Sequence, residues 1–175
     1  MLMPNPQDWF RFVVHGIPSW DPADWTTRDA AIAAELNPFN IRTFPSRELQ
    51  PFKDRGGKIL SYHGQQDQQI TSMNTERWFE HLRSGMNTTF SELDDFVRYF
   101  RISGMFHCSG GPGAWKIGQN SGQGLPFDGR YNVLAAIVEW VEQGKPPEFI
   151  TGTKHLNDSV AAGIEFQRRH CRYVT

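Results

Sequence analysis

Asp67 and His107 are the two residues of this sequence whose types and placement can do chemistry. A carboxylate can hold an imidazole in one tautomer, and the imidazole can then act as general base and afterwards as general acid. An acid and a histidine that follow successive strands therefore suit a nucleophilic hydrolase. Both residue types are also common in loops, so the alternative stays open that Asp67 is a turn residue and His107 an incidental polar group.

Three segments must position these side chains. Residues 56–64, "GGKILSYHG", are a short apolar run bounded by glycines and predict a buried strand, and residues 96–102, "FVRYFRI", predict a second one. Residues 72–85 between them show helical spacing of apolar side chains and end at a glycine. This order predicts a parallel sheet with a right-handed crossover. Because Asp67 and His107 follow the carboxyl ends of the two strands, we expect both side chains at the same edge.

Two further helices are expected. Residues 29–36 predict a short helix that Asn37 and Pro38 end. Residues 128–147 predict a longer helix, capped by Asp128 and ended by Gly144. The expected apolar stripe of this second helix consists of Tyr131, Leu134, Val138 and Val141.

Composition divides the chain into three parts. Residues 1–55 are rich in Trp, Pro and Asp and are interpreted as a connector, whereas residues 56–150 carry the expected sheet and helices. Residues 151–175 form a basic tail, which we expect to be a helix followed by a disulfide-tethered arm. Three tryptophans of the first part either pack within it or line a substrate channel: Trp9, Trp20 and Trp25.

The totals of the chain limit its function. Its 175 residues correspond to one ordinary domain, and a net charge of -1 gives no electrostatic case for binding nucleic acid or an anionic membrane. No apolar run approaches the ~20 residues that a membrane helix needs. The first residues lack a signal-peptide pattern, which by itself suggests a cytosolic protein. Asn87 and Asn157 stand in glycosylation sequons, which hint at secretion instead.

The two cysteines, Cys108 and Cys171, leave three alternatives open. They can pair with each other, stay free, or bond to cysteines outside this chain. No nucleophile is evident either, because the pattern G-x-S-x-G does not occur. The serines in glycine-rich loops lack the strand–turn–helix context of that pattern and are interpreted as structural: Ser103, Ser109 and Ser121.

Other candidate sites are weaker. His63 could join Asp67 and His107 in a metal site, but no metal-ligand spacing such as H-E-x-x-H occurs, and a core histidine at a strand end is the better account. Residues 110–113, "GGPG", lack the ending of a phosphate loop and predict a turn that passes close to the site. An acidic cluster could imitate a glycosidase pair but is interpreted as a solvated turn: Glu92, Asp94 and Asp95.

Three motifs in a fixed order carry a resemblance to a known family. They are "HGQQDQQI" at residues 63–70, "GMFHCSGGPGA" at residues 104–114 and "WVEQGKPPE" at residues 140–148. With them, the stretch from Leu49 to His170 resembles the C-terminal third of the tannase and feruloyl esterase family. The Pro- and Trp-rich start is similar to the end of that family's lid region.

The resemblance implies an α/β-hydrolase fold with a large inserted lid, and hydrolysis of esters of aromatic acids such as gallate or ferulate. By resemblance, Asp67 is the acid and His107 the base of a serine triad, whose chain order is Ser, Asp, His. Cys108 is similar to the family cysteine that forms a disulfide with a cysteine adjoining the nucleophilic serine. Cys171 resembles a cysteine whose partner lies further downstream. The family also implies a secreted protein.

The sequence departs from the family pattern mainly by what it lacks. It has no serine motif and no acidic lid loop of the kind that binds calcium in this family, so no cofactor is expected in this chain. Ser103 stands where proline is frequent, and Phe106, where a smaller residue is common, can reshape the acyl side of the pocket. We expect a chain truncated at both ends or one subunit of a processed protein, with the serine on its partner segment.

The alternative is a catalytically inactive remnant with at most a structural or binding role. Two strands taken from a larger parallel sheet would expose an unpaired edge and apolar faces that the full protein covers. As an isolated chain, such a remnant is expected to be marginally stable or prone to aggregation.

Overall fold

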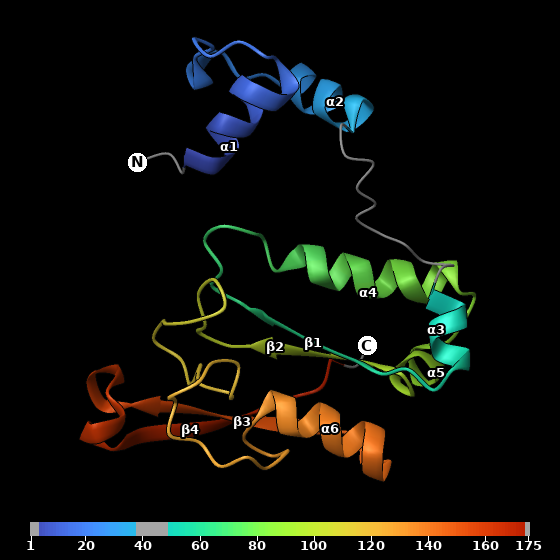
Figure 1. Cartoon of the computed structure of the whole chain (residues 1–175), viewed down its shortest axis with the longest axis vertical. Helices are drawn as coiled ribbons and strands as arrows, with labels where there is room; N and C mark the ends of the chain where they lie inside the picture. Colours follow the sequence, from blue (N-terminus) through green and yellow to red (C-terminus); the bar gives the residue numbers. More distant parts are fainter. Residues whose placement is uncertain (1–3, 38–48, 174–175) are drawn as a thin grey trace. The chain divides into compact units, whose positions relative to one another are not determined.

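A computed structural model describes residues 4–37 and 49–173 of the chain. The chain divides into two compact units, Met1–Thr43 and Phe44–Thr175. The first unit consists of short helices, and the second combines helices with two small sheets, as in a partial α/β fold (Figure 1).

The first unit contains α1 (Pro4–Asp8), η1 (Trp9–Val14), η2 (Pro22–Asp24) and α2 (Thr27–Leu36). The helix predicted at residues 29–36 is therefore confirmed. It begins two residues earlier because Thr26 and Asp29 form a capping box, in which each side chain bonds the other residue's backbone N–H. The helix ends at Asn37, whose φ of 31° lies in the left-handed region.

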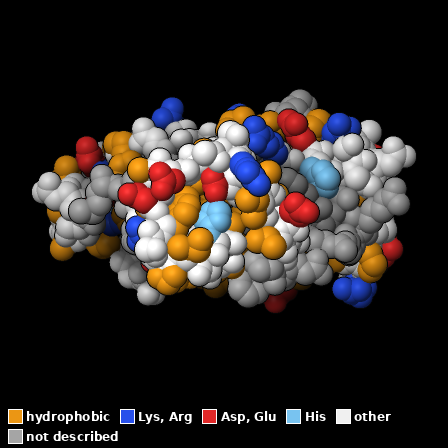
Figure 2. Space-filling model, turned by 90° about the horizontal axis from the view of Figure 1, so that it is seen from above, with side chains coloured by type: hydrophobic (Ala, Val, Ile, Leu, Met, Phe, Trp, Pro, Cys, Tyr) orange, Lys and Arg blue, Asp and Glu red, His pale blue; other side chains and the backbone are white. Residues whose placement is uncertain are grey.

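Aromatic packing holds the first unit together. The ring of Phe10 stacks on Trp20 with 5.7 Å between centroids and meets Trp25 edge to face at 6.5 Å. Trp20 therefore packs within the unit, whereas Trp25 contacts Phe10 but is 45% exposed. Some apolar side chains of the unit remain exposed: Phe12, Ile17 and Leu36. Figure 2 shows a face on which apolar side chains lie among acidic, basic and histidine side chains.

The second unit contains the parallel sheet that the sequence predicts. Its strands are β1 (Ile59–Gly64) and β2 (Val97–Ile102), which pair in parallel from Ile59 opposite Val97 to Gly64 opposite Ile102. The crossover between them contains α4 (Met73–Gly85) and α5 (Phe90–Asp94), and α3 (Gln50–Asp54) precedes β1. β2 is buried along nearly its whole length, as is typical of a parallel strand covered on both faces.

Two hydrophobic clusters form the core of this unit. Alternate residues of β2 point to opposite faces of the sheet, and the two clusters divide them accordingly. The first cluster packs α4 and α5 against one face and contains Phe79, Leu82, Leu93, Phe96, Val97 and Tyr99. The second cluster lies on the other face and contains Phe100, Ile102, Met105, Ile117, Val133 and Ile150.

The helix expected within residues 128–147 is α6 (Val133–Gln143). Its predicted cap is wrong, because Asn132 Oδ1 accepts hydrogen bonds from the first backbone N–H groups of the helix. Asp128 instead accepts hydrogen bonds from Arg130 in the turn before α6. The predicted end is confirmed, since Gly144 takes a left-handed φ of 64° and caps the helix.

The predicted apolar stripe of α6 is also wrong. Leu134 and Val141 are each 58% exposed, and Tyr131 precedes the helix. The side that faces the core contains Val133, Ala135, Ala136 and Trp140. Because α6 is apolar on more than one side, its sequence pattern does not indicate which side packs against the sheet.

The tail is a β-hairpin rather than the expected helix and arm. β3 (Phe149–His155) and β4 (Ile164–Cys171) pair antiparallel, and η4 (Leu156–Asp158) and η5 (Val160–Ala162) connect them. β4 is exposed over most of its length, so its sequence lacks the apolar alternation by which a half-buried strand is recognised. A bridge between Phe100 and Arg172 places the end of the hairpin beside β2.

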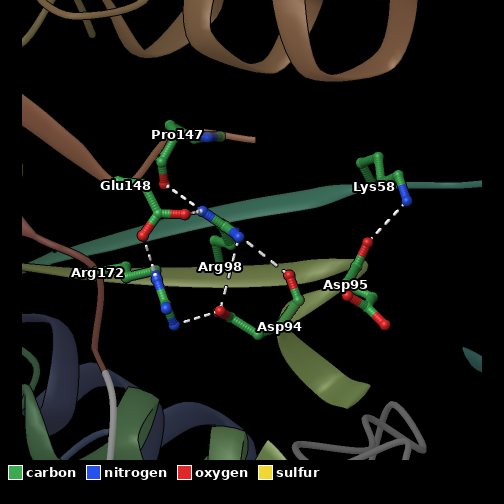
Figure 3. Close-up of polar contacts among 7 residues, drawn as sticks. All are labelled: Lys58, Asp94, Asp95, Arg98, Pro147, Glu148 and Arg172. Atoms are coloured by element: carbon green, nitrogen blue, oxygen red, sulfur yellow. Dashed lines mark hydrogen bonds and ion pairs between the residues drawn. The ribbon is translucent and has the colours of Figure 1, made fainter. Parts of the chain in front are cut away.

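A network of charged side chains joins β2 to the hairpin (Figure 3). Arg98 donates to the backbone oxygen of Pro147 at 2.9 Å and to Glu148 at 2.7 Å, and Arg172 donates to Glu148 and Asp94. Burial raises the pKa of the Asp94 carboxyl, and the two arginines oppose that rise. The interpretation of the acidic cluster as a solvated turn is therefore wrong for Asp94, which is only 8% exposed.

Candidate active site

The loops after β1 and β2 bring Asp67 and His107 together. Because the strands are parallel, their carboxyl ends lie at one edge of the sheet, and each residue follows one of these ends closely. His107 Nδ1 lies 2.9 Å from Asp67 Oδ2. The Asp67 side chain is 2% exposed and the His107 side chain 36%. A buried acid thus holds one nitrogen of a partly exposed imidazole, although the catalytic role of the pair stays a prediction.

Local hydrogen bonds and one close approach determine where Asp67 lies. Its Oδ1 accepts hydrogen bonds from the backbone N–H groups of Gln69 at 2.8 Å and Ile70 at 2.9 Å, as in an Asx turn. The turn begins at Gly64, where an added Cβ would lie 2.3 Å from the backbone oxygen of Met105. Only glycine therefore lets the two loops meet at this point.

The glycine-rich segment at residues 110–113 turns back onto the end of β2, as predicted. A Cβ added to Gly113 would lie 2.0 Å from the backbone oxygen of Ser103. Lys154 Nζ of β3 donates a hydrogen bond to the backbone oxygen of Gly111 at 2.9 Å. The hairpin thus holds the loop against the edge of the sheet where the candidate pair lies.

Hydrogen bonding keeps Asp67 ionised. Burial by itself would raise the pKa of its carboxyl, but bonds from Ile70, His107, Gln69 and His63 lower the pKa to about 2. An ionised carboxylate only accepts hydrogen bonds, so the His107 nitrogen that faces it, Nδ1, carries the proton. Nε2 of neutral His107 then has a free lone pair, and no hydrogen bond from the described residues reaches it. This is the tautomer that a general base requires.

From the sequence, His63 is interpreted as a core histidine at a strand end, and its contact with Asp67 is not predicted. Its Nε2 lies 3.1 Å from Asp67 Oδ2, and its Nδ1 lies 2.6 Å from Thr75 Oγ1 in α4. It is therefore a second partner of the same carboxylate. The available signal was its spacing of four residues from Asp67 on the strand-to-loop junction. Within residues 4–37 and 49–173, no group of three or more His, Cys, Asp and Glu side chains is arranged to hold a metal.

Cys108 and Cys171 are both exposed and free in the structure, so they do not pair with each other. Cys108 has a left-handed φ of 59°. Gln119 Nε2 donates a hydrogen bond to its backbone oxygen at 3.1 Å, and because Cys108 follows His107 directly, this contact also holds the histidine loop. Disulfides to cysteines outside the chain stay a prediction.

The remaining sequence-predicted residues lie at the surface. The serines interpreted as structural are exposed, and none of them bonds to His107 within the described part of the chain: Ser103, Ser109 and Ser121. Asn87 and Asn157 are also exposed, and their glycosylation stays a prediction. Among the described helices, none combines the length and the apolar character that crossing a membrane requires.

Known proteins resemble this chain over nearly its whole length. A family model described as tannase and feruloyl esterase matches residues 29–174. A probable feruloyl esterase B-2 from Aspergillus flavus is 54% identical over 171 residues, which are 96% of this chain and 32% of that protein. The solved structure of an esterase from Aspergillus oryzae matches with a TM-score of 0.89 and 44% identity, over 95% of this chain and 33% of that one.

A second solved structure, feruloyl esterase B from Aspergillus oryzae, matches with a TM-score of 0.87 and 42% identity. The match covers 95% of this chain and 32% of that structure. The chain therefore spans about a third of the length of the relatives that it matches.

Proposed function

The chain belongs to the tannase and feruloyl esterase family, and on that premise we propose that it supplies the aspartate and the histidine of a serine-type carboxylic ester hydrolase. The observation that carries the proposal is the 2.9 Å contact between His107 Nδ1 and Asp67 Oδ2 at the carboxyl edge of the parallel strands. Residues 56–150 would form the C-terminal part of an α/β-hydrolase domain, residues 1–55 the end of a lid insertion, and residues 151–175 a C-terminal tail.

In the proposed mechanism, a serine hydroxyl attacks the ester carbonyl while His107 Nε2 accepts its proton. His107 then returns the proton to the leaving alcohol, and a water molecule repeats the sequence on the acyl-enzyme. Asp67 orients the ring and stabilises its charged form. With a pKa of about 2, Asp67 stays ionised throughout, so it takes no proton from His107.

The nucleophile of this mechanism would come from a segment or subunit outside the chain, as would the oxyanion hole. Two features support this part of the proposal. No strand within the described residues pairs with the outer edge of β1. An apolar hollow on the face of the sheet that α6 covers is lined by residues of β1 and α6, among them Leu60, Tyr62, Leu134 and Ile137. Cys108 would tether His107 to the serine segment through a disulfide, which would limit their separation.

The proposed substrates are esters of aromatic acids of the gallate or hydroxycinnamate type. Relatives named feruloyl esterase support this class. Phe106 adjoins His107 in sequence and is 41% exposed, so its ring can contact the acyl group. We further propose a secreted protein with glycans at Asn87 and Asn157. The calcium site of the family would lie outside this chain.

A chimera tests the proposal. This chain would replace the matched third of the Aspergillus flavus relative, and hydrolysis of methyl ferulate, methyl gallate and p-nitrophenyl acetate would be measured. We expect activity that falls by about 10⁶-fold in His107→Ala and by about 10⁴-fold in Asp67→Asn. The isolated chain, assayed beside it, is expected to be inactive.

Each other outcome has a distinct meaning. A folded chimera without activity would favour the inactive remnant. Activity that survives His107→Ala would refute the assignment of the base. Turnover by the isolated chain that depends on His107 would show that the chain carries its own nucleophile, and Ser109 would be tested first.

A further inference from the structure

One oxygen of Asp67 is shared by two imidazoles. Oδ2 lies 2.9 Å from His107 Nδ1 and 3.1 Å from His63 Nε2. The other oxygen, Oδ1, accepts hydrogen bonds from the backbone N–H groups of Gln69 and Ile70. A carboxylate offers about four lone-pair sites, and all four are therefore engaged, so rotation of the carboxylate plane would break several hydrogen bonds at once.

The partners of His63 determine its tautomer. Its Nε2 faces Asp67 Oδ2 and, at 3.2 Å, the backbone oxygen of Ile70. Both are acceptors, so Nε2 carries a proton. In the neutral ring, Nδ1 then accepts a hydrogen bond from the hydroxyl of Thr75 at 2.6 Å. Both ring nitrogens are used inside the fold, which leaves His63 no free nitrogen to act as a base.

His63 and Thr75 lie on regular elements, whereas Asp67 lies on a loop. His63 belongs to β1, its side chain is only 13% exposed, and Thr75 lies in the first turn of α4. The Asp67 carboxylate is thus held from a strand and, through His63, from a helix. Side chains on rigid elements position a site more accurately than loop residues alone.

We propose that His63, oriented by Thr75, is a positioning residue that directs the Asp67 carboxylate at His107 and so keeps His107 in its Nδ1–H tautomer. The catalytic role of the Asp67–His107 pair rests on the proposed function. The tautomer itself is a property of the chain and requires no substrate or nucleophile.

The test observes the imidazoles of the 175-residue chain directly. The chain would be labelled with ¹⁵N-histidine, and long-range ¹H–¹⁵N correlation spectra would be recorded at a pH above the titration range of histidine, where neutral tautomers differ in their nitrogen shifts. Each histidine would be assigned by its own substitution. We expect His107 to be protonated at Nδ1 and His63 at Nε2.

Two pairs of variants separate positioning from packing. His63→Leu removes the donor to Asp67, whereas His63→Gln keeps an amide N–H at nearly the same place. Thr75→Val removes the hydroxyl that orients His63, whereas Thr75→Ser keeps it. We expect the His107 signals to shift toward the Nε2–H form in His63→Leu and Thr75→Val, and to stay unchanged in the two conservative variants.

His155→Gln is the matched control. It replaces another buried imidazole, whose Nδ1 lies 3.2 Å from Lys116 Nζ and which makes no hydrogen bond to Asp67 within the described part of the chain. It should leave the His107 signals unchanged. Backbone amide spectra of every variant would show that the fold is retained. If His63→Leu does not fold, the His107 signals of Thr75→Val test the positioning role instead.

Two results would overturn the inference. The first is that His107 keeps its Nδ1–H form in folded His63→Leu or, if that variant does not fold, in Thr75→Val. The second is that His107 has the Nε2–H form in the unaltered chain. In the active chimera, His63→Leu should lower kcat by about 10²-fold with little change in KM. A silent chimera with the expected tautomers would overturn the proposed function and leave the positioning role standing. If the chimera is active but the tautomer of His107 does not change in His63→Leu, the positioning role would be overturned and the proposed function would stand.

Discussion

Replacing Asp67 by asparagine should remove a defined part of the chain's stability. The carboxyl pKa is lowered from 3.8 to about 2 in the folded chain, and the side chain is 2% exposed. At about 1.36 kcal/mol per pKa unit, this difference stabilises the folded state by about 2.5 kcal/mol at neutral pH. Asp67→Asn should therefore lower the free energy of unfolding by about that amount.

The loss should depend on pH in a predictable way. A carboxyl whose pKa is lower in the folded than in the unfolded state contributes stability above its unfolded pKa and loses it as pH falls through the folded pKa. For Asp67 the contribution is complete above about pH 5, roughly half remains at about pH 3, and little remains near pH 2. The difference between the unaltered chain and Asp67→Asn should shrink over the same range.

Urea unfolding followed by tryptophan fluorescence measures this difference at neutral pH and near pH 3. Asp128→Asn is the matched control. Hydrogen bonds from Arg130 lower the pKa of Asp128 to about 2 as well, but that pair is exposed, so solvent screening should leave little effect on stability. An Asp67→Asn loss as large at low pH as at neutral pH would refute the reasoning, because it would come from packing rather than from ionisation.

Three further predictions concern other parts of the chain. Arg98→Met should lower the free energy of unfolding in urea by about 3 kcal/mol, because it removes one of the two arginines that pair with the buried carboxylate of Asp94. Arg130→Met, at an exposed ion pair, should change little, and equal losses would contradict the prediction. Gly113→Ala should cost about 1–3 kcal/mol in thermal unfolding, because its Cβ would lie 2.0 Å from a backbone oxygen; an unchanged Tm would show that the loop adapts. A thiol reagent should titrate both Cys108 and Cys171 in the native chain, and a thiol that reacts only in denaturant would count against their exposure.

The parallel sheet and its crossover were predictable because the signals are local. The apolar run of β1, the alternation of β2 and the helical spacing of α4 each lie within a few residues of one another. The hairpin was not predictable in the same way. β4 is exposed, basic and almost without apolar alternation, and it is a strand because β3 pairs with it along its whole length.

The sequence by itself determined that Asp67 and His107 follow successive strands, and parallel pairing with a right-handed crossover is enough to bring such residues to one edge. Only the tertiary structure decided that His63 shares the Asp67 carboxylate, that Asp94 is buried between two arginines, and which side of α6 faces the core. The contact of Arg172 with Asp94 and the packing of α6 join segments distant in the chain. The contact of His63 with Asp67 joins residues only four apart, but it depends on how the loop after β1 folds back onto the strand. A local period in the sequence reports which side chains share a face of one element, but not which other element covers that face.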